Sequence, residues 1–182
     1  MKVAALLGNV TPHRQLLSAT RWLLDHGFPE RVDAGVISLV EKHFAFGRGK
    51  PGYQDDSAAI FCKLTAANAV ILATPVYERG ISDSLSNLLY HLPVEAVASK
   101  PIGIIVIGGT RDQFVGIDWH LRNVLVWWDA LTVPASVHLE AGDMVSGRPS
   151  TGAEQRLRVL VNSVIQLAKA GQGPDTLSPA GI

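Results

Sequence analysis

The sequence has little of what a disulfide-bonded, nucleic-acid-binding or membrane-spanning protein needs. Its only cysteine, Cys62, excludes an intrachain disulfide and a cysteine-based zinc cluster, and it favours a reducing cytoplasm as the compartment. Sixteen basic residues balance sixteen acidic ones, so no net positive field is available to hold a nucleic acid. No apolar run reaches the roughly 18 residues of a transmembrane helix. We therefore expect no nucleic-acid partner and no membrane insertion.

Familiar ligand-binding and catalytic motifs are scarce as well. The six histidines show neither the i, i+4 pairing nor the carboxylate partners of a metal site, so we predict no bound metal. The segment from Gly47 to Gly52 satisfies GxGxxG, but no strong strand precedes it, and we treat the match as accidental. Cys62 lies in a helical stretch, where burial explains it better than nucleophilic use.

Three short and wholly apolar runs are present, and each ends in turn residues. The runs are Val3 to Leu7, Ala69 to Ala73 and Ile102 to Ile107, followed by Gly8, Thr74-Pro75 and Gly108-Gly109. Continuous apolar strands are typical of a parallel sheet that helices cover on both faces. Two weaker strand candidates, Val36 to Leu39 and Val133 to Leu139, bring the expected number of strands to five.

Segments with the period of an amphipathic helix lie between these strands. Apolar residues recur at i, i+3, i+4 and i+7 from Leu85 and again from Leu121, and a longer stripe runs from Leu157 to Ala168. Thr151 and Glu154 are spaced as a capping box at the start of that last helix. A further helix from Leu16 ends near Gly27. The alternation of strand and helix predicts an open, doubly wound α/β sheet.

One domain is expected, because 182 residues is close to the usual size of a single domain and no linker divides the chain. We assign residues 1–170 to this domain. The segment from Glu41 to Gln54 has neither helical nor strand period and is predicted to be a long surface loop. Residues 171–182 begin with Gly-Gln-Gly-Pro and are predicted to form a disordered tail.

Ligands of open α/β sheets bind beyond the carboxyl ends of the strands, so three loops matter most. These loops are Gly8 to Gln15, Thr74 to Ser82 and Gly108 to Gly116. The first runs into a helix, and its N–H groups and the helix dipole favour an anion such as phosphate, although an ordinary strand-to-helix turn is the alternative. The second loop can form one side of a pocket for a flat ligand. The glycines of the third let a planar ring approach the backbone closely.

One segment makes a family resemblance specific. Ala73-Thr74-Pro75-Val76-Tyr77, followed eight residues later by Leu85 and then by Asn87-Leu88-Leu89, resembles the flavin motif of the NADPH-dependent FMN reductase family. The similarity runs from about residue 2 to residue 170. The stretch from Ala73 through Gly109-Thr110 to Asp118-Trp119 most resembles the FMN reductases of two-component alkanesulfonate monooxygenase systems. The resemblance implies a flavodoxin-like, three-layer fold of five parallel strands in the order 2-1-3-4-5.

The resemblance also implies where FMN would bind. The FMN phosphate would contact Gly8, Asn9, Thr11, Arg14 and Gln15; the ribityl chain and isoalloxazine would contact Thr74, Pro75, Val76 and Tyr77; and Gly108, Gly109 and Thr110 would flank the ring. The usual first loop, Gly-Ser-x-Arg, is replaced here by Gly8-Asn9-Val10-Thr11-Pro12-His13-Arg14, which would suit loose binding and flavin release. Arg79 or Arg111 is placed to attract the NADPH 2′-phosphate.

Two aromatic positions on the fourth helix suggest an oligomer. In the family, an aromatic or histidine insertion forms a π-bulge at a tetramer interface, and Trp119-His120 fall at the comparable place, with core packing as the alternative. Trp127 lies beside Trp128 on the same helix, so both cannot face one core stripe. We expect a homodimer or homotetramer formed through Trp119, His120 and Trp127.

The sequence thus predicts an NAD(P)H-dependent FMN reductase that supplies reduced flavin to a flavin-dependent monooxygenase. No catalytic residue in the strict sense is expected, because hydride transfer between nicotinamide and flavin is chemistry of the cofactors. One alternative is a reductase that keeps its FMN and acts on quinones, azo dyes or metal oxyanions. Others are a non-enzymatic electron carrier, against which the zero net charge argues, and a flavin-free binding protein.

Overall fold

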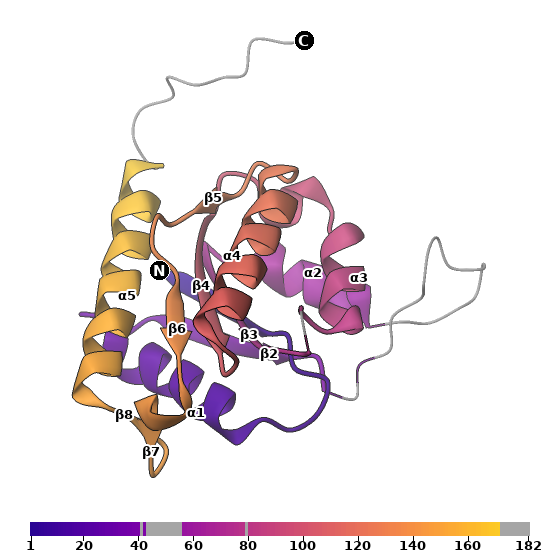
Figure 1. Ribbon diagram of the computed structural model, residues 1–182. Helices are drawn as coiled ribbons and strands as arrows, with labels where there is room; N and C mark the ends of the chain where they lie inside the picture. The colour runs from indigo at the N-terminus through magenta and orange to yellow at the C-terminus, as the bar shows by residue number, and fades with distance from the viewer. Residues whose placement is uncertain (41, 43–55, 79, 172–182) are drawn as a thin grey trace.

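The computed structural model describes residues 1–40, 42, 56–78 and 80–171. Its middle layer is a parallel sheet in the order β2-β1-β3-β4-β5, in which β6 also pairs with β4 (Figure 1). The predicted strand order 2-1-3-4-5 is therefore confirmed. The strands of this sheet are β1 (Lys2–Leu7), β2 (Asp33–Ser38), β3 (Ala69–Pro75), β4 (Pro101–Ile107), β5 (Leu131–Thr132) and β6 (Val137–Leu139).

Helices cover both faces of the sheet, and each apolar period predicted from the sequence begins within one of them, at Leu16, Leu85, Leu121 and Leu157. They are α1 (Arg14–Trp22), which continues into the π-helical turn η1 (Leu23–Gly27), α2 (Ser57–Thr65), α3 (Asp83–Tyr90), α4 (Arg111–Val126) and α5 (Thr151–Ala170). Short elements complete the chain: the 3₁₀ turns η2 (Val94–Ala96) and η3 (Ala141–Asp143) and the antiparallel pair β7 (Met144–Val145) and β8 (Arg148–Pro149). No helix within the described ranges is long and apolar enough to cross a membrane.

Two hydrophobic clusters form, one on each face of the sheet, because side chains alternate along a strand. In β1, Val3, Ala5 and Leu7 pack with α1 and α5, whereas Ala4 and Leu6 pack with α2, α3 and α4. The central strands are buried on both sides, which explains why their sequences are continuously apolar. Leu7 pairs with Ala73, and Pro75 pairs with Ile107, so β1, β3 and β4 end at the same edge.

The predicted fifth strand from Val133 to Leu139 is wrong as a single element. β5 and β6 each pair with β4, and Pro134, which has no N–H for the ladder, lies between them. The guanidinium of Arg122 on α4 donates to the carbonyls of Val133 (2.8 Å) and Pro134 (3.3 Å), and it forms an ion pair with Asp118 (3.0 Å). The backbone carbonyls in this break between β5 and β6 therefore accept hydrogen bonds from a side chain of α4.

Two local predictions about helices are also corrected. The sequence left a π-bulge and core packing open at Trp119-His120. α4 is a continuous α-helix there, Trp119 is 68% exposed, and a π-helical turn lies at the end of α1. Cys62 is exposed on α2, because Ile60 and Leu64, four residues apart, point the other side of that helix into the core. Except for Lys42, the predicted loop from Glu41 to Gln54 lies outside the described residues. The tail beyond Gly171 lies outside them as well.

The N-cap residue of α5 lies one position before the N-cap of the predicted capping box. Ser150, rather than Thr151, is the N-cap residue, and its hydroxyl accepts the N–H of Ala153 at 3.3 Å. Glu154 forms an ion pair with Arg158 at 3.0 Å instead of closing a box. A capping box is present at the start of α4, where Thr110 and Gln113 bond each other reciprocally.

Candidate functional site

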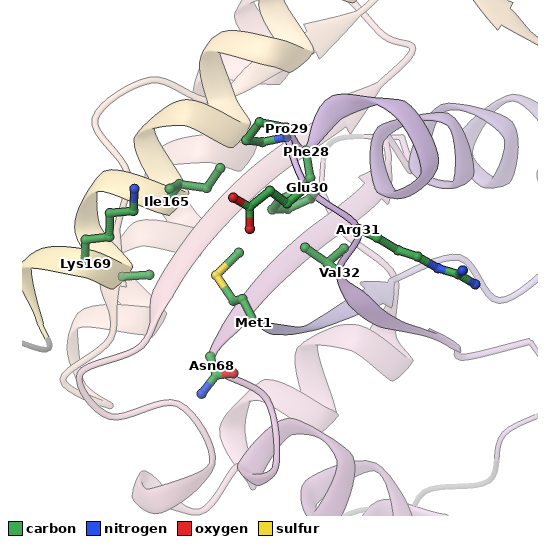
Figure 2. A pocket seen from close by; sticks show the side chains of 10 residues that line it. Met1, Phe28, Pro29, Glu30, Arg31, Val32, Asn68, Ile165 and Lys169 are labelled. Carbon is green, nitrogen blue, oxygen red and sulfur yellow. The ribbon is translucent and has the colours of Figure 1, made fainter.

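The carboxyl edge of the sheet brings together the three loops that the sequence singles out. They leave β1, β3 and β4, the central three strands, and each leads toward a helix on one face or the other. A hollow of about 340 Å³ lies elsewhere, lined by Met1, Asn68 and residues of the η1–β2 loop and of α5 (Figure 2). Met1 and Asn68 precede β1 and β3, so this hollow is at the opposite edge and is separate from the three loops.

The first loop is tied to its neighbours at Gly8. The Gly8 N–H donates to Ala73 at 2.8 Å, and its carbonyl accepts the buried Ser82 hydroxyl at 2.7 Å. Asn9 is only 4% exposed, and one N–H of its amide donates to the Thr11 carbonyl at 2.8 Å. His13 caps α1 by accepting the Leu16 N–H at 3.2 Å. This loop is therefore a shaped turn with its own side-chain bonds.

The second loop closes on itself and reaches across to the first. The N–H of Tyr77 donates to Gly80 at 2.9 Å, and the N–H of Gly80 donates back to Tyr77 at 2.6 Å. The Tyr77 hydroxyl accepts the N–H of Val10 at 3.0 Å. Glu78, which lies between Tyr77 and Gly80, has a φ of +41°, which is unusual for a residue with a side chain. The first two loops are thus held together by Tyr77 and by Ser82.

The third loop is a pair of left-handed glycines. Gly108 and Gly109 have φ angles of +80° and +70°, conformations that favour glycine. The Gly108 N–H donates to Leu139 at 2.8 Å, and its carbonyl lies 3.0 Å from His138 Nε2. Because a carbonyl only accepts, His138 carries its hydrogen on Nε2 in this contact. Both peptide groups that flank Gly108 are therefore fixed from the β6 side.

Gln113 joins the third loop to the second. Its Oε1 accepts the Thr110 N–H at 2.8 Å, and its Nε2 donates to the Glu78 carbonyl at 2.5 Å. Sequence reasoning missed Gln113, Ser82 and His138 as members of the site. A signal existed for Gln113, because Thr110-x-x-Gln113 has the spacing of a capping box. The contacts of Ser82 and His138 span 74 and 30 residues and leave no mark on local sequence.

The predicted site residues do not all reach the surface. Thr74 and Pro75 are buried in β3, and the Thr74 hydroxyl donates to the Pro75 carbonyl at 3.0 Å. Val76 and Tyr77 are half-buried at the edge. The remaining exposed positions are Thr11, Arg14, Gln15, Gly109, Thr110 and Arg111, whereas Arg79 lies outside the described residues. Among the described residues, no group of three or more His, Cys, Asp or Glu side chains could hold a metal.

The start of α1 concentrates positive charge. Arg14 is the first residue of this helix, and no acidic residue is present in its first turn. The N-terminal end of a helix carries a partial positive charge, so an exposed arginine there is unfavourable unless an anion is bound nearby. The first loop therefore has the electrostatics of an anion site.

Comparison with known proteins identifies the fold and the family. The fold is shared with an NADH:FMN oxidoreductase (TM-score 0.72, 18% identity, covering 96% of this chain and 91% of that one). It is also shared with a flavodoxin from Pseudomonas aeruginosa (TM-score 0.60, 22% identity, 91% and 99% covered). Fold and loop geometry together define a flavodoxin-like α/β protein. A model of the NADPH-dependent FMN reductase family matches residues 1–143, and the chain belongs to that family.

Curated relatives agree with this assignment. An NAD(P)H-dependent FAD/FMN reductase of Geobacillus thermodenitrificans is 24% identical over 130 residues, which is 70% of either chain. An FMN-dependent NADPH-azoreductase of Staphylococcus aureus is 25% identical over 149 residues, which is 79% of either chain. The protein is therefore an oxidoreductase of the NAD(P)H-dependent FMN reductase type, and FMN and NAD(P)H are its cofactors.

Two features of the edge fit FMN. An added Cβ on Gly108 would meet no atom within 4 Å, so open space lies beside that backbone for a planar ring. Asn9 Oδ1 is buried and has no hydrogen-bond partner within the described part of the chain. Because the amide of Asn9 is oriented by Thr11, this oxygen needs a donor, and a ribityl hydroxyl supplies one, whereas a phosphate dianion does not.

Proposed function

We propose that the protein transfers hydride from NAD(P)H to FMN at the carboxyl edge of the sheet and releases the reduced flavin to a flavin-dependent monooxygenase, as in two-component systems. The observation that carries the FMN assignment to this edge is the first turn of α1. Arg14 and the helix dipole there have no acidic residue to balance them. The cytoplasm, where NAD(P)H is available, is the proposed location.

In this proposal the chain binds and orients, and the flavin supplies the hydride chemistry when it is bound. Arg14, Thr11 and Gln15 hold the phosphate with the free N–H groups of the first loop. Val76 and Tyr77 wall one side of the ring. Gly108, Gly109 and Thr110 lie along its edge, where the left-handed glycines keep side chains out of the way. Thr74 and Pro75, being buried, support the loops from below.

Arg14→Ala is expected to weaken FMN binding about tenfold, because a hydrogen bond to a charged group contributes about 1.5–3 kcal/mol. Riboflavin, which lacks the phosphate, is expected to bind with unchanged affinity. Quenching of flavin fluorescence on titration with protein measures both dissociation constants.

Arg21→Ala is the matched control, since Arg21 is an exposed arginine in the last turn of the same helix. It removes the same charge at the other end of α1. If FMN binding were weakened equally in the two variants, the effect would be one of net charge alone. That result would contradict a phosphate site in this loop.

A second candidate function is reduction of an azo compound or quinone by protein that keeps its FMN. The similarity to the Staphylococcus aureus azoreductase, 25% over 149 residues, favours it as much as the FMN reductase relative favours the first. Retention of FMN by the purified protein distinguishes the two candidate functions. If the purified protein stays yellow through desalting and reduces a quinone far faster than added FMN, the second candidate replaces the first.

We further propose that the protein is a homodimer or homotetramer whose subunits meet on α4. Trp119 and Trp127 are 68% and 81% exposed, and Val115 and Val126 are also exposed on this helix. Next to them a groove of about 580 Å³ is lined by Tyr90, His120, Asn123, Val124, Trp127 and Trp128. Val115, Trp119 and Val126 are spaced four and seven residues apart, so they lie on one face of the helix, and exposed apolar side chains gathered on one face mark interaction surfaces.

Replacing both exposed tryptophans, Trp119→Glu with Trp127→Glu, is expected to convert the oligomer into a folded monomer, because the charges cannot be buried unpaired. Sedimentation equilibrium measures the mass. Val159→Glu is the control, since Val159 is exposed on α5, on the opposite face of the sheet. A wild-type protein that is monomeric, or a double variant of unchanged mass, would contradict the proposal.

A further inference from the structure

The Tyr77 side chain has two ends that do different things. Its backbone belongs to the second loop, which is closed by the mutual hydrogen bonds between Tyr77 and Gly80. Its hydroxyl lies in the first loop, 3.0 Å from the backbone nitrogen of Val10. A hydroxyl at this position accepts the hydrogen of that N–H. Tyr77 thus belongs to the second loop and supplies a hydrogen-bond acceptor to the first loop.

Some N–H groups in and just after the first loop are already bonded within the protein or are missing. Gly8 donates to Ala73, Leu16 donates to the His13 ring, and Pro12 has no N–H. A loop that precedes a helix binds phosphate by pointing free N–H groups at it. Each N–H that is already bonded within the protein is lost to the ligand or must be shared with it. The bond from Val10 to Tyr77 therefore bears directly on how tightly this loop can hold a phosphate.

We propose that the Tyr77 hydroxyl competes with the FMN phosphate for the Val10 N–H, so that Tyr77 weakens flavin binding and favours release of the reduced flavin. The inference rests on the proposed function, which puts the FMN phosphate in this loop. It assigns Tyr77 as a positioning residue whose ring and hydroxyl have opposite effects. Removal of the hydroxyl alone tightens binding of FMN, whereas it would weaken binding if both ends of Tyr77 held the flavin.

Tyr77→Phe tests the proposal, because it keeps the ring and removes only the hydroxyl, which accepts the Val10 N–H. The FMN dissociation constant is expected to fall about fivefold, the size of one hydrogen bond, and the rate of FMN dissociation is expected to fall with it. Riboflavin, which has no phosphate, is expected to bind both proteins equally. Fluorescence titration gives the affinities and stopped-flow displacement gives the dissociation rates. Tyr90→Phe, an exposed tyrosine on α3, is the matched control and leaves both ligands unchanged.

Several outcomes would overturn the inference. Weaker or unchanged FMN binding in Tyr77→Phe would mean that the hydroxyl only braces the two loops. An equal change for FMN and riboflavin would mean that it acts through the ring. Arg14→Ala separates this failure from failure of the proposed function: if FMN binding is insensitive to Arg14, the phosphate does not lie in this loop at all. If Arg14→Ala weakens FMN and Tyr77→Phe does not tighten it, only the role of Tyr77 is wrong.

Discussion

Gly109→Ala is expected to destabilise the protein by about 2–5 kcal/mol, combining about 1–2 kcal/mol for a left-handed residue with a Cβ and about 1–3 kcal/mol for overpacking. An added Cβ would lie 2.7 Å from Val76 Cγ2 and 2.9 Å from Gln113 Oε1. Neither neighbour can move freely. The backbone N–H of Val76 is hydrogen-bonded to the Ile107 carbonyl. The side-chain amide of Gln113 is hydrogen-bonded to the backbone of Thr110 and Glu78. Urea denaturation measures the loss as a lower midpoint with an unchanged slope.

Gly108→Ala separates the two contributions. Gly108 has a similar φ, +80°, but an added Cβ would meet nothing within 4 Å. Only the conformational part, about 1–2 kcal/mol, is expected to remain. The space beside Gly108 is where the proposed flavin ring lies, so FMN affinity is expected to fall in this variant although it stays folded. Equal destabilisation of the two variants would contradict the packing described for Gly109.

Gly8→Ala is expected to destabilise the protein by about 1–3 kcal/mol, because an added Cβ would overlap Leu85 Cδ2. Leu85 is fully buried beneath the first loop and has no room to turn away. Thermal or urea unfolding measures the effect. Gly35→Ala on β2 is the control, since an added Cβ there meets nothing within 4 Å and stability should hold or rise by about 0.5 kcal/mol.

A double-mutant cycle tests the contact between Gly8 and Leu85 directly. Leu85→Ala alone leaves a cavity and is expected to remove about 2–5 kcal/mol. In the double variant the new methyl group occupies part of that cavity, so the total loss is expected to fall short of the sum by about 0.5–3 kcal/mol. Strict additivity would mean that Gly8 and Leu85 do not restrict each other.

Much of the fold could be predicted because the central strands are buried on both faces. Burial makes the segments from Val3, Ala69 and Ile102 continuously apolar, and parallel topology then puts their loops at one edge. The break in the fifth strand could not be predicted in the same way. It depends on Pro134 together with Arg122, a residue of α4 whose bonds to the break form only when the helix packs on the sheet.

The meeting of the three loops at one edge was predictable, but the bonds within and between them were not. The motif containing Thr74 and Tyr77 lies in the second of these loops, yet a motif does not say which side chains are buried, and Thr74 is buried. The links made by Ser82 and His138 join distant segments, so only the packed fold brings them together. For Cys62 the signal was present, since Ile60 and Leu64 define the buried side of α2.

Reduction of FMN by NAD(P)H is the activity on which the proposed roles of the three loops rest. The most direct test follows NADPH and NADH oxidation by the purified protein in the steady state, with FMN, FAD, riboflavin and a quinone as competing acceptors. We expect FMN to be the preferred acceptor and riboflavin to be poorer, because it lacks the phosphate that Arg14 holds. Absence of NAD(P)H oxidation with FMN, or a quinone rate far above the FMN rate, would contradict the proposed function.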